Sequence, residues 1–144
     1  DVNKKSILIL DDISATDRMY SIDFKNIKAE FGKNVVEEYN IIKCFGSMCG
    51  FIAEKFINNS NIKIDVGILD ISIGNIIKLK QGSIKEIDGV DIAMLLMKTS
   101  SDVKIIFMTG HAVTMKNKDC VHYFEKFNNQ TGENIEDYYY YCLA

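Results

Sequence analysis

The sequence predicts an open α/β fold, a doubly wound five-stranded parallel sheet with helices on both of its faces. Three observations support this prediction. Several short runs are apolar on both faces, as in strands buried within a parallel sheet. Segments with helical spacing of apolar residues alternate with these runs. Polar residues follow the runs directly, where such folds place their ligand sites. The 144 residues fit a single domain over 1–144.

Composition excludes several classes of protein. The chain carries 17 Lys plus Arg against 20 Asp plus Glu, a formal charge of −3, and 47% hydrophobic residues, so it is not a disordered chain. A mildly acidic chain is a poor general binder of nucleic acid, because nucleic acid requires a basic face. The longest uncharged run, Ile105–Met115, falls far short of the roughly 20 apolar residues that span a bilayer. We expect a cytoplasmic domain with four reduced cysteines that binds neither nucleic acid nor membranes.

The first half of the chain predicts two strands and two helices. Ser6–Leu10 is a continuous apolar run that stops at two aspartates, which indicates a buried strand. A helix is expected from Ser14 to about Lys28, with Ser14 as its N-cap. Tyr39–Cys44 is the second expected strand. Ser47 to about Ile57 is the second helix, because its apolar residues fall on one side.

The second half continues the alternation. Asp65–Ile71 is a short apolar strand, and Gly89–Thr99 is a helix with a broad apolar face. Val103–Met108 is the fourth expected strand and Val121–Phe124 the fifth. Asn134–Leu143 is expected to be a terminal helix. The predicted order is therefore β-α-β-α-β-α-β-β-α, with a short link between the last two strands.

A long link separates the third strand from the helix at Gly89. Alternating residues around Gln81-Gly82-Ser83 predict a small hairpin within residues 71–87. This hairpin would lie beside the carboxyl end of the third strand as a lid or a partner contact. A tolerated surface insertion explains it equally well.

Five polar residues follow the predicted strands: Asp11, Asp12, Asp70, Thr109 and Lys126. Each alone is explained by turn or capping chemistry, but together they should meet at one edge of the sheet. Three close carboxylates repel one another, and Mg²⁺ with oxygen ligands relieves that repulsion. A hydroxyl and an ammonium suit an anion beside the metal. This equipment is typical of phosphoryl transfer to a carboxylate.

From Ser6 onward the chain resembles bacterial response-regulator receiver domains, which have a flavodoxin-like (βα)5 fold. The motifs that carry the resemblance are Ile-Leu-Ile-Leu-Asp11-Asp12-Ile-Ser-Ala-Thr-Asp-Arg18, Val66-Gly-Ile-Leu-Asp70, Asp88-Gly89-Val-Asp-Ile-Ala, Ile-Ile-Phe-Met-Thr109-Gly110-His111-Ala112 and Tyr123-Phe-Glu-Lys126.

The resemblance implies a role for each matching residue. Asp70 would be the phosphoacceptor. Asp11, Asp12 and Asp70 would hold Mg²⁺, with the backbone carbonyl of Ser72 as a further ligand. The remaining roles are phosphoryl contacts by Thr109 and Lys126, switching by Thr109 and Tyr123, and tuning of the phosphoryl lifetime by Ser72 and His111.

Three departures from the family pattern bear on this expectation. Phe127 follows Lys126 where the family usually has proline, and the 71–87 link is longer than usual. The stretch from Thr109 to Lys126 is shorter than usual, so the fourth helix should be short or missing.

The expected function is that of a phosphoacceptor switch in a two-component phosphorelay. The donor would be a phosphohistidine of a sensor histidine kinase or a histidine phosphotransfer protein. The downstream protein partner is not identified, and a homodimer stays open. The domain would not be a metabolic enzyme and would catalyse only its own aspartyl phosphorylation and dephosphorylation.

Three alternatives stay beside this reading. A degenerate receiver would bind partners without phosphorylation. A phosphatase of the haloacid dehalogenase type would carry a second aspartate two residues after its nucleophile, where this chain has Ser72. A flavin or nucleotide binder would need a glycine-rich phosphate loop, which the sequence lacks.

Overall fold

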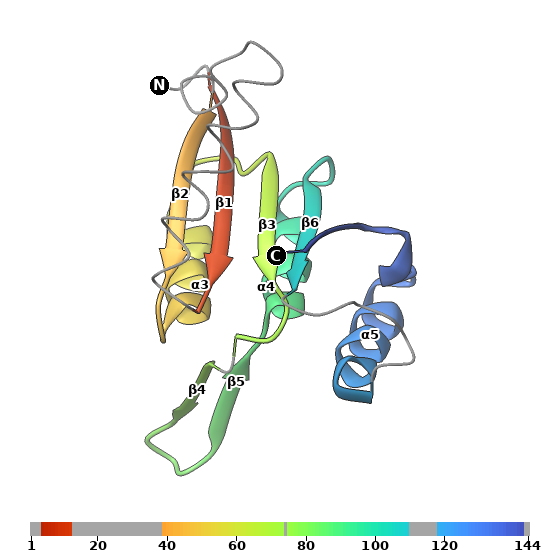
Figure 1. Cartoon of the computed structure of the whole chain (residues 1–144). Helices are drawn as coiled ribbons and strands as arrows, with labels where there is room; N and C mark the ends of the chain where they lie inside the picture. Colours follow the sequence, from red (N-terminus) through yellow and green to blue (C-terminus); the bar gives the residue numbers. More distant parts are fainter. Residues whose placement is uncertain (1–3, 13–38, 74, 110–117, 143–144) are drawn as a thin grey trace.

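The computed structural model describes residues 4–12, 39–73, 75–109 and 118–142. Within these residues a five-stranded sheet has the order β2-β1-β3-β6-β7, with every pair parallel (Figure 1). The strands are β1 Lys5–Asp11, β2 Tyr39–Phe45, β3 Val66–Asp70, β6 Lys104–Thr109 and β7 Tyr139–Cys142. The chain adds β2 on one side of β1 and the later strands on the other. The doubly wound parallel sheet is therefore confirmed, and its order reverses between β1 and β3.

Three described helices connect these strands. They are α3 Cys49–Asn59, α4 Gly89–Thr99 and α5 Lys118–Thr131, and a single 3₁₀ turn, η1, follows at Ile135–Asp137. The expected bounds of α4 are confirmed, and α3 begins and ends two residues later than expected. The helix expected at Ser14–Lys28 lies outside the described residues. Over the part of the chain that the structure describes, no helix has the length and apolar character needed to cross a membrane.

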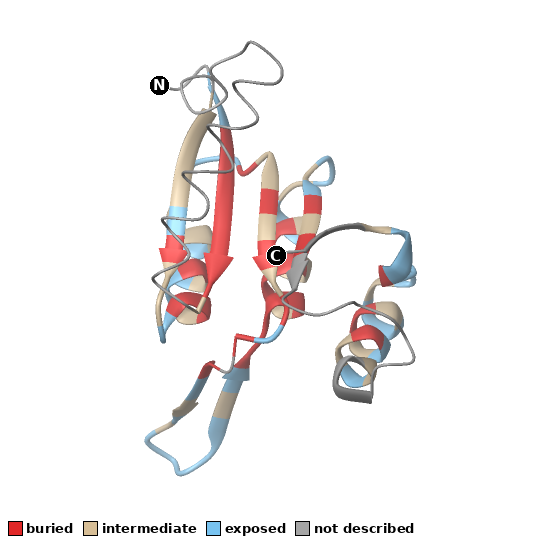
Figure 2. Ribbon diagram, in the orientation of Figure 1, coloured by how far each residue is buried: buried red, intermediate tan, exposed pale blue. Residues whose placement is uncertain are grey.

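The core follows from the alternation of side chains along the strands. Leu8 and Leu10 of β1 join a large buried cluster with α3, α4 and α5. Ile7 and Ile9, on the opposite face of β1, pack with Val66 of β3 and other apolar residues in a smaller cluster. A strand buried on both faces is what its continuous apolar sequence predicts, and β1 is buried from its second residue onward (Figure 2).

The strand expected at Val121–Phe124 is wrong, because these residues lie inside α5. Phe124 and Phe127 are spaced three apart, so they share one helix face, and both are fully buried. The Phe127 ring meets that of Phe107 edge to face, with 5.8 Å between centroids. The helix ends at Thr131 and is followed by Gly132, whose φ of 73° suits glycine after a helix. The helix between β6 and the last strand, which was expected to be short or missing, is therefore α5, with a full 14 residues.

The terminal helix expected at Asn134–Leu143 is also wrong. Only Ile135–Asp137 form a helical turn, and Tyr139–Cys142 form β7, which pairs in parallel with β6. A run of tyrosines has high strand propensity, which favours a strand over a helix at this edge of the sheet. The fifth strand of the sheet thus comes after α5, so that α5 connects β6 to β7.

The predicted hairpin is confirmed. Strands β4 Asn75–Lys78 and β5 Ile84–Ile87 pair antiparallel, and the turn contains Gly82 at φ 89°. The base of the hairpin is fixed to α3 through Asn75, whose side chain is 1% exposed. Its Oδ1 accepts from the Gly50 N–H, and its Nδ2 donates to the carbonyls of Ser47 and Ile73. The insertion is therefore anchored to the domain.

Candidate functional site

Three aspartates meet at the carboxyl edge of the sheet. Asp11 is the last residue of β1, Asp12 follows it, and Asp70 is the last residue of the neighbouring strand β3. One carboxylate oxygen from each lies within 4.8 Å of the others, and Asp11 is almost fully buried. The sequence prediction that these three residues converge is confirmed, because parallel neighbours end at the same edge.

Burial and like charge both disfavour the ionised form of Asp70 in this cluster. Burial, followed by the negative charges of Asp11 and Asp12, raises the pKa of Asp70 from 3.8 to about 8. A hydrogen bond from the Ser72 N–H to the Asp70 carboxylate acts in the opposite direction. Three close oxygens under such repulsion form a donor set that fits a hard divalent cation, and Mg²⁺ is commonly held by one or two carboxylates with several waters.

Helix α4 begins directly against the backbone of Asp70. A Cβ atom at Gly89 would lie 1.9 Å from the carbonyl oxygen of Asp70, so no side chain fits there. The Gly89 N–H donates to the carbonyl of Ile71 at 2.8 Å. The first turn of α4 therefore fixes the path of the chain that leaves Asp70.

Thr109 is the last residue of β6, and the Met108 beside it pairs with Asp70 in the register of β3 and β6. The backbone of Thr109 thus lies at the same edge of the sheet as the three aspartates, as expected. His111, the other residue expected near this edge, lies outside the described residues.

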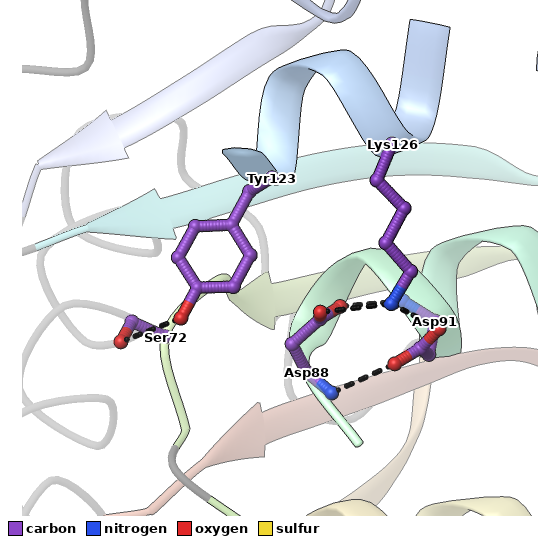
Figure 3. A network of polar contacts seen from close by, with 5 residues as sticks. All are labelled: Ser72, Asp88, Asp91, Tyr123 and Lys126. Carbon is purple, nitrogen blue, oxygen red and sulfur yellow. Dashed lines mark hydrogen bonds and ion pairs between the residues drawn. The ribbon is translucent and has the colours of Figure 1, made fainter. Parts of the chain in front are cut away.

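Lys126 is not at a strand end. It lies on α5, and its Nζ is 3.0 Å from Oδ2 of Asp88 and 2.6 Å from Oδ1 of Asp91, at the start of α4 (Figure 3). Burial opposes the charged form of Lys126, but hydrogen bonds to Asp91 and Asp88 outweigh burial and raise its pKa. The expected place of Lys126 at a strand end is therefore corrected: it lies on a helix, and its ammonium joins α5 to α4.

Tyr123 also lies on α5, so its expected place on the fifth strand is wrong. Its hydroxyl is 3.3 Å from the Oγ of Ser72, two residues after Asp70 (Figure 3). The contact is exposed and long for a hydroxyl hydrogen bond. Phe127 lies within the same helix and not in a loop after a strand. Its position therefore does not correspond to the proline that the family usually has.

The comparisons with known proteins find similarity in structure only. No protein-family model and no curated protein matches the sequence. A response regulator receiver protein from Sinorhizobium medicae is similar in structure, with a TM-score of 0.53 and 16% identity over 98% of this chain and 83% of that one.

This chain has the receiver-domain fold.

Two further solved structures resemble it more distantly. Response regulator protein TrrA from Thermotoga maritima, in complex with Mg²⁺-BeF, has a TM-score of 0.44 and 21% identity over 97% of this chain and 87% of its own. TrrA in complex with histidine kinase ThkA has a TM-score of 0.45 and 22% identity over 81% and 78% of the two chains.

Sequence reasoning missed how this receiver fold uses Asp88 and Asp91. Each side chain accepts a hydrogen bond from the backbone N–H of the other, a reciprocal cap at the start of α4. The same two carboxylates hold Lys126. Two acidic residues three apart before an apolar run are the sequence signal of such a cap. The signal was missed because Asp88 was assigned only to the family motif Asp88-Gly89.

The two cysteines whose side chains are described are free thiols. Cys44 and Cys49 are buried, and burial is the main cause that raises their pKa values, to about 11 and about 12. The negative charge of Asp12 adds to the shift at Cys49. Neither thiol is suited to act as a nucleophile at neutral pH, because the thiolate is the reactive form.

Proposed function

We propose that this domain is a phosphoacceptor switch in which Asp70 receives a phosphoryl group. The observation that carries the proposal is the convergence of three carboxylates within 4.8 Å at the reversal of strand order in a receiver fold. The proposed donor is a phosphohistidine on a sensor histidine kinase or a histidine phosphotransfer protein.

In the transfer, an oxygen of the ionised Asp70 carboxylate attacks phosphorus in line. The new O–P bond forms as the N–P bond breaks, and the imidazole nitrogen leaves with the electron pair. The Ser72 N–H orients the carboxylate and favours its ionised form. Gly89 allows α4 to lie against the Asp70 backbone, so the backbone of the acceptor is held in place during the transfer.

The ion proposed for the site is Mg²⁺, held by Asp11, Asp12 and Asp70 and by the carbonyl of Ser72. When bound, it would neutralise the carboxylates and so keep Asp70 ionised at neutral pH. Thr109, at the same edge, is the proposed hydroxyl contact to the phosphoryl oxygens. Lys126 has no part in this proposal, because its ammonium is held by Asp88 and Asp91.

The test is intact-mass measurement after incubation with Mg²⁺ and acetyl phosphate. The wild type should gain the mass of one phosphoryl group, and Asp70→Asn should gain none. Asp102→Asn is the matched control, because Asp102 lies just before β6, at the opposite edge of the sheet, and is held by Lys63. It should be labelled as the wild type is.

A calorimetric Mg²⁺ titration supplements the mass measurement. If the wild type takes no label and binds no Mg²⁺, the switch is refuted and a domain that binds partners without phosphorylation is the better description. If label appears on Asp70→Asn as well, the acceptor is another residue. Binding of Mg²⁺ without label from acetyl phosphate would require a protein donor, and a panel of phosphorylated histidine phosphotransfer proteins then replaces acetyl phosphate.

A further inference from the structure

The inserted hairpin projects from the carboxyl edge of the sheet, beyond the ends of β1 and β3 (Figure 1). Its base is buried, with Asn75 1% exposed and Ile87 2% exposed. Any side chain at Gly50 would meet Ile73, Asn75 and Ile87 within 2.9 Å, so α3 and the hairpin base are in close contact. The base of the hairpin is therefore fixed to the domain, so the orientation of its outer face is fixed as well.

The two faces of the hairpin differ. Directly opposed residues of an antiparallel pair share a face, and alternate residues along each strand share it too. One face packs toward α3, where Lys85 contacts Glu54 and its Nζ lies 5.9 Å from the centre of the Phe51 ring. The residues of the other face are all exposed. It presents Ile76, Lys78, Ile84 and Glu86.

These four side chains form a two-by-two grid. Ile76 is opposite Glu86, and Lys78 is opposite Ile84, so the isoleucines occupy one diagonal and the opposite charges the other. Ile76 and Ile84 are 56% and 70% exposed. Within the described part of the chain, neither Lys78 nor Glu86 makes an ion pair.

We propose that this outer face of the hairpin pairs with the same face of a second copy of the chain. A two-fold axis along the Ile76–Ile84 diagonal places each isoleucine against its own counterpart. The same axis places Lys78 against Glu86 of the partner subunit, twice. The strands of the two hairpins then cross at a steep angle, as in orthogonal packing of sheets.

Only this symmetry satisfies the grid. A two-fold axis along the strands or across them places each isoleucine against a charge. An axis along the other diagonal places Lys78 against its own counterpart, and Glu86 likewise. The pattern of the four residues therefore selects one isologous arrangement, which a scattered set of exposed residues would not do.

The size of the face sets the strength of the pairing. Four side chains per copy cover much less than the roughly 800 Å² per partner of a stable complex. The pairing is therefore weak and depends on protein concentration and, through Lys78 and Glu86, on salt. It is independent of phosphorylation and stands or falls separately from the proposed function.

The test is sedimentation velocity at low salt over a range of protein concentrations, with three variants. Lys78→Glu turns both cross-subunit contacts into Glu–Glu repulsion, and Glu86→Lys turns both into Lys–Lys repulsion. Each should lower the association constant of the wild type about tenfold or more. Lys80→Glu makes the same charge change in the hairpin turn, outside the grid, and should leave association at the wild-type level.

The decisive sample is an equimolar mixture of Lys78→Glu and Glu86→Lys. Both contacts become attractive again in the mixed dimer, so association should return to the wild-type level in a 1:1 complex although each variant alone associates more weakly. Circular dichroism on each variant confirms that the fold is retained. The proposal is overturned by a wild type that stays monomeric throughout, by single variants that associate normally, or by a mixture that does not recover. In the first case a different protein would be the partner of this face.

Discussion

Two acidic clusters lie on either side of Gly89 and are balanced differently. The first, Asp11, Asp12 and Asp70, ends two neighbouring strands, and the charges that act most strongly on Asp70 are both negative. The second, Asp88 and Asp91, begins α4 and holds the ammonium of Lys126 between its two carboxylates. In the first cluster burial, followed by like charge, raises the pKa of Asp70 to about 8. In the second, burial opposes the charged form of Lys126, but hydrogen bonds to Asp91 and Asp88 raise its pKa.

The difference separates the proposed metal and phosphoryl site from a contact between two helices. In the second cluster the ammonium of Lys126 offsets the charge of the two carboxylates. In the first cluster the carboxylates repel one another unless a proton or a cation binds among them. Gly89 brings the two clusters close without merging them. A match of Lys126 to a family motif therefore does not tell which of the two clusters its ammonium contacts.

The largest effect that sharpens this comparison is expected from Asp12→Asn. Removal of one carboxylate from the first cluster should lower Mg²⁺ affinity about a hundredfold, and calorimetric titration measures it. Labelling of Asp70 by acetyl phosphate should slow in parallel, because the acceptor is present but its cation is not. Unchanged Mg²⁺ affinity would show that the cation site lies elsewhere.

The next largest effect is expected from Lys126→Met. The variant leaves Asp88 and Asp91 without their cation, so the free energy of unfolding should fall by about 2 kcal/mol in urea titration. Lys85→Met is the matched control: its pair with Glu54 is more exposed, and the loss should stay below about 1 kcal/mol.

Labelling tests the same variant in a second way. Because Lys126 does not join the aspartate cluster, Lys126→Met should still accept a phosphoryl group at Asp70. Loss of the label in a variant that remains folded would return Lys126 to the phosphoryl site and break the distinction between the two clusters.

A smaller effect concerns pH in the presence of a chelator. The pKa of Asp70 is 3.8 unperturbed and about 8 in the folded chain, so the folded state holds this proton more tightly. The contribution of Asp70 to stability is present below about pH 4 and is lost as pH rises through about 8. The melting temperature of the wild type should therefore fall more between pH 5 and pH 8 than that of Asp70→Asn. Equal slopes in the two proteins would contradict the raised pKa of Asp70.

The smallest effect is expected from Tyr123→Phe. Its exposed 3.3 Å contact with Ser72 should contribute less than about 0.5 kcal/mol to the free energy of unfolding. Ser72→Ala removes the same contact and should give a change of similar size, and the double variant should add little. A loss above 1 kcal/mol for Tyr123→Phe alone would mean that the tyrosine has a second, structural role.

The first four strands of the sheet and the first cluster could be predicted because their signals are local. Apolar runs that stop at Asp11-Asp12 and Asp70 identify buried parallel strands, and the edge where they end follows from the topology. The hairpin was predictable from alternation around Gly82. The helix α4 was predictable from its broad apolar face.

The region after β6 was mispredicted because its signals compete. Val121–Phe124 is short, and a short run rich in β-branched and aromatic residues is ambiguous between strand and helix. The spacing of Phe124 and Phe127, together with Gly132 as a helix stop, favours the helix but requires a longer window. The partners of Lys126 depend on how α5 packs against α4, and no local pattern encodes that packing.

Gly89 has a consequence for which sequences this fold tolerates. Its hydrogen atom faces the Asp70 carbonyl oxygen, which would lie 1.9 Å from the carbon of even a methyl side chain. Position 89 is therefore closed to every other amino acid for a reason of space and not of reactivity. In a library of all single substitutions, intolerance at this position should equal that of Asp70 itself, although Gly89 contributes no functional group. A residue beside the proposed acceptor can thus be restricted to glycine by the fit of two backbones and not by its own chemistry.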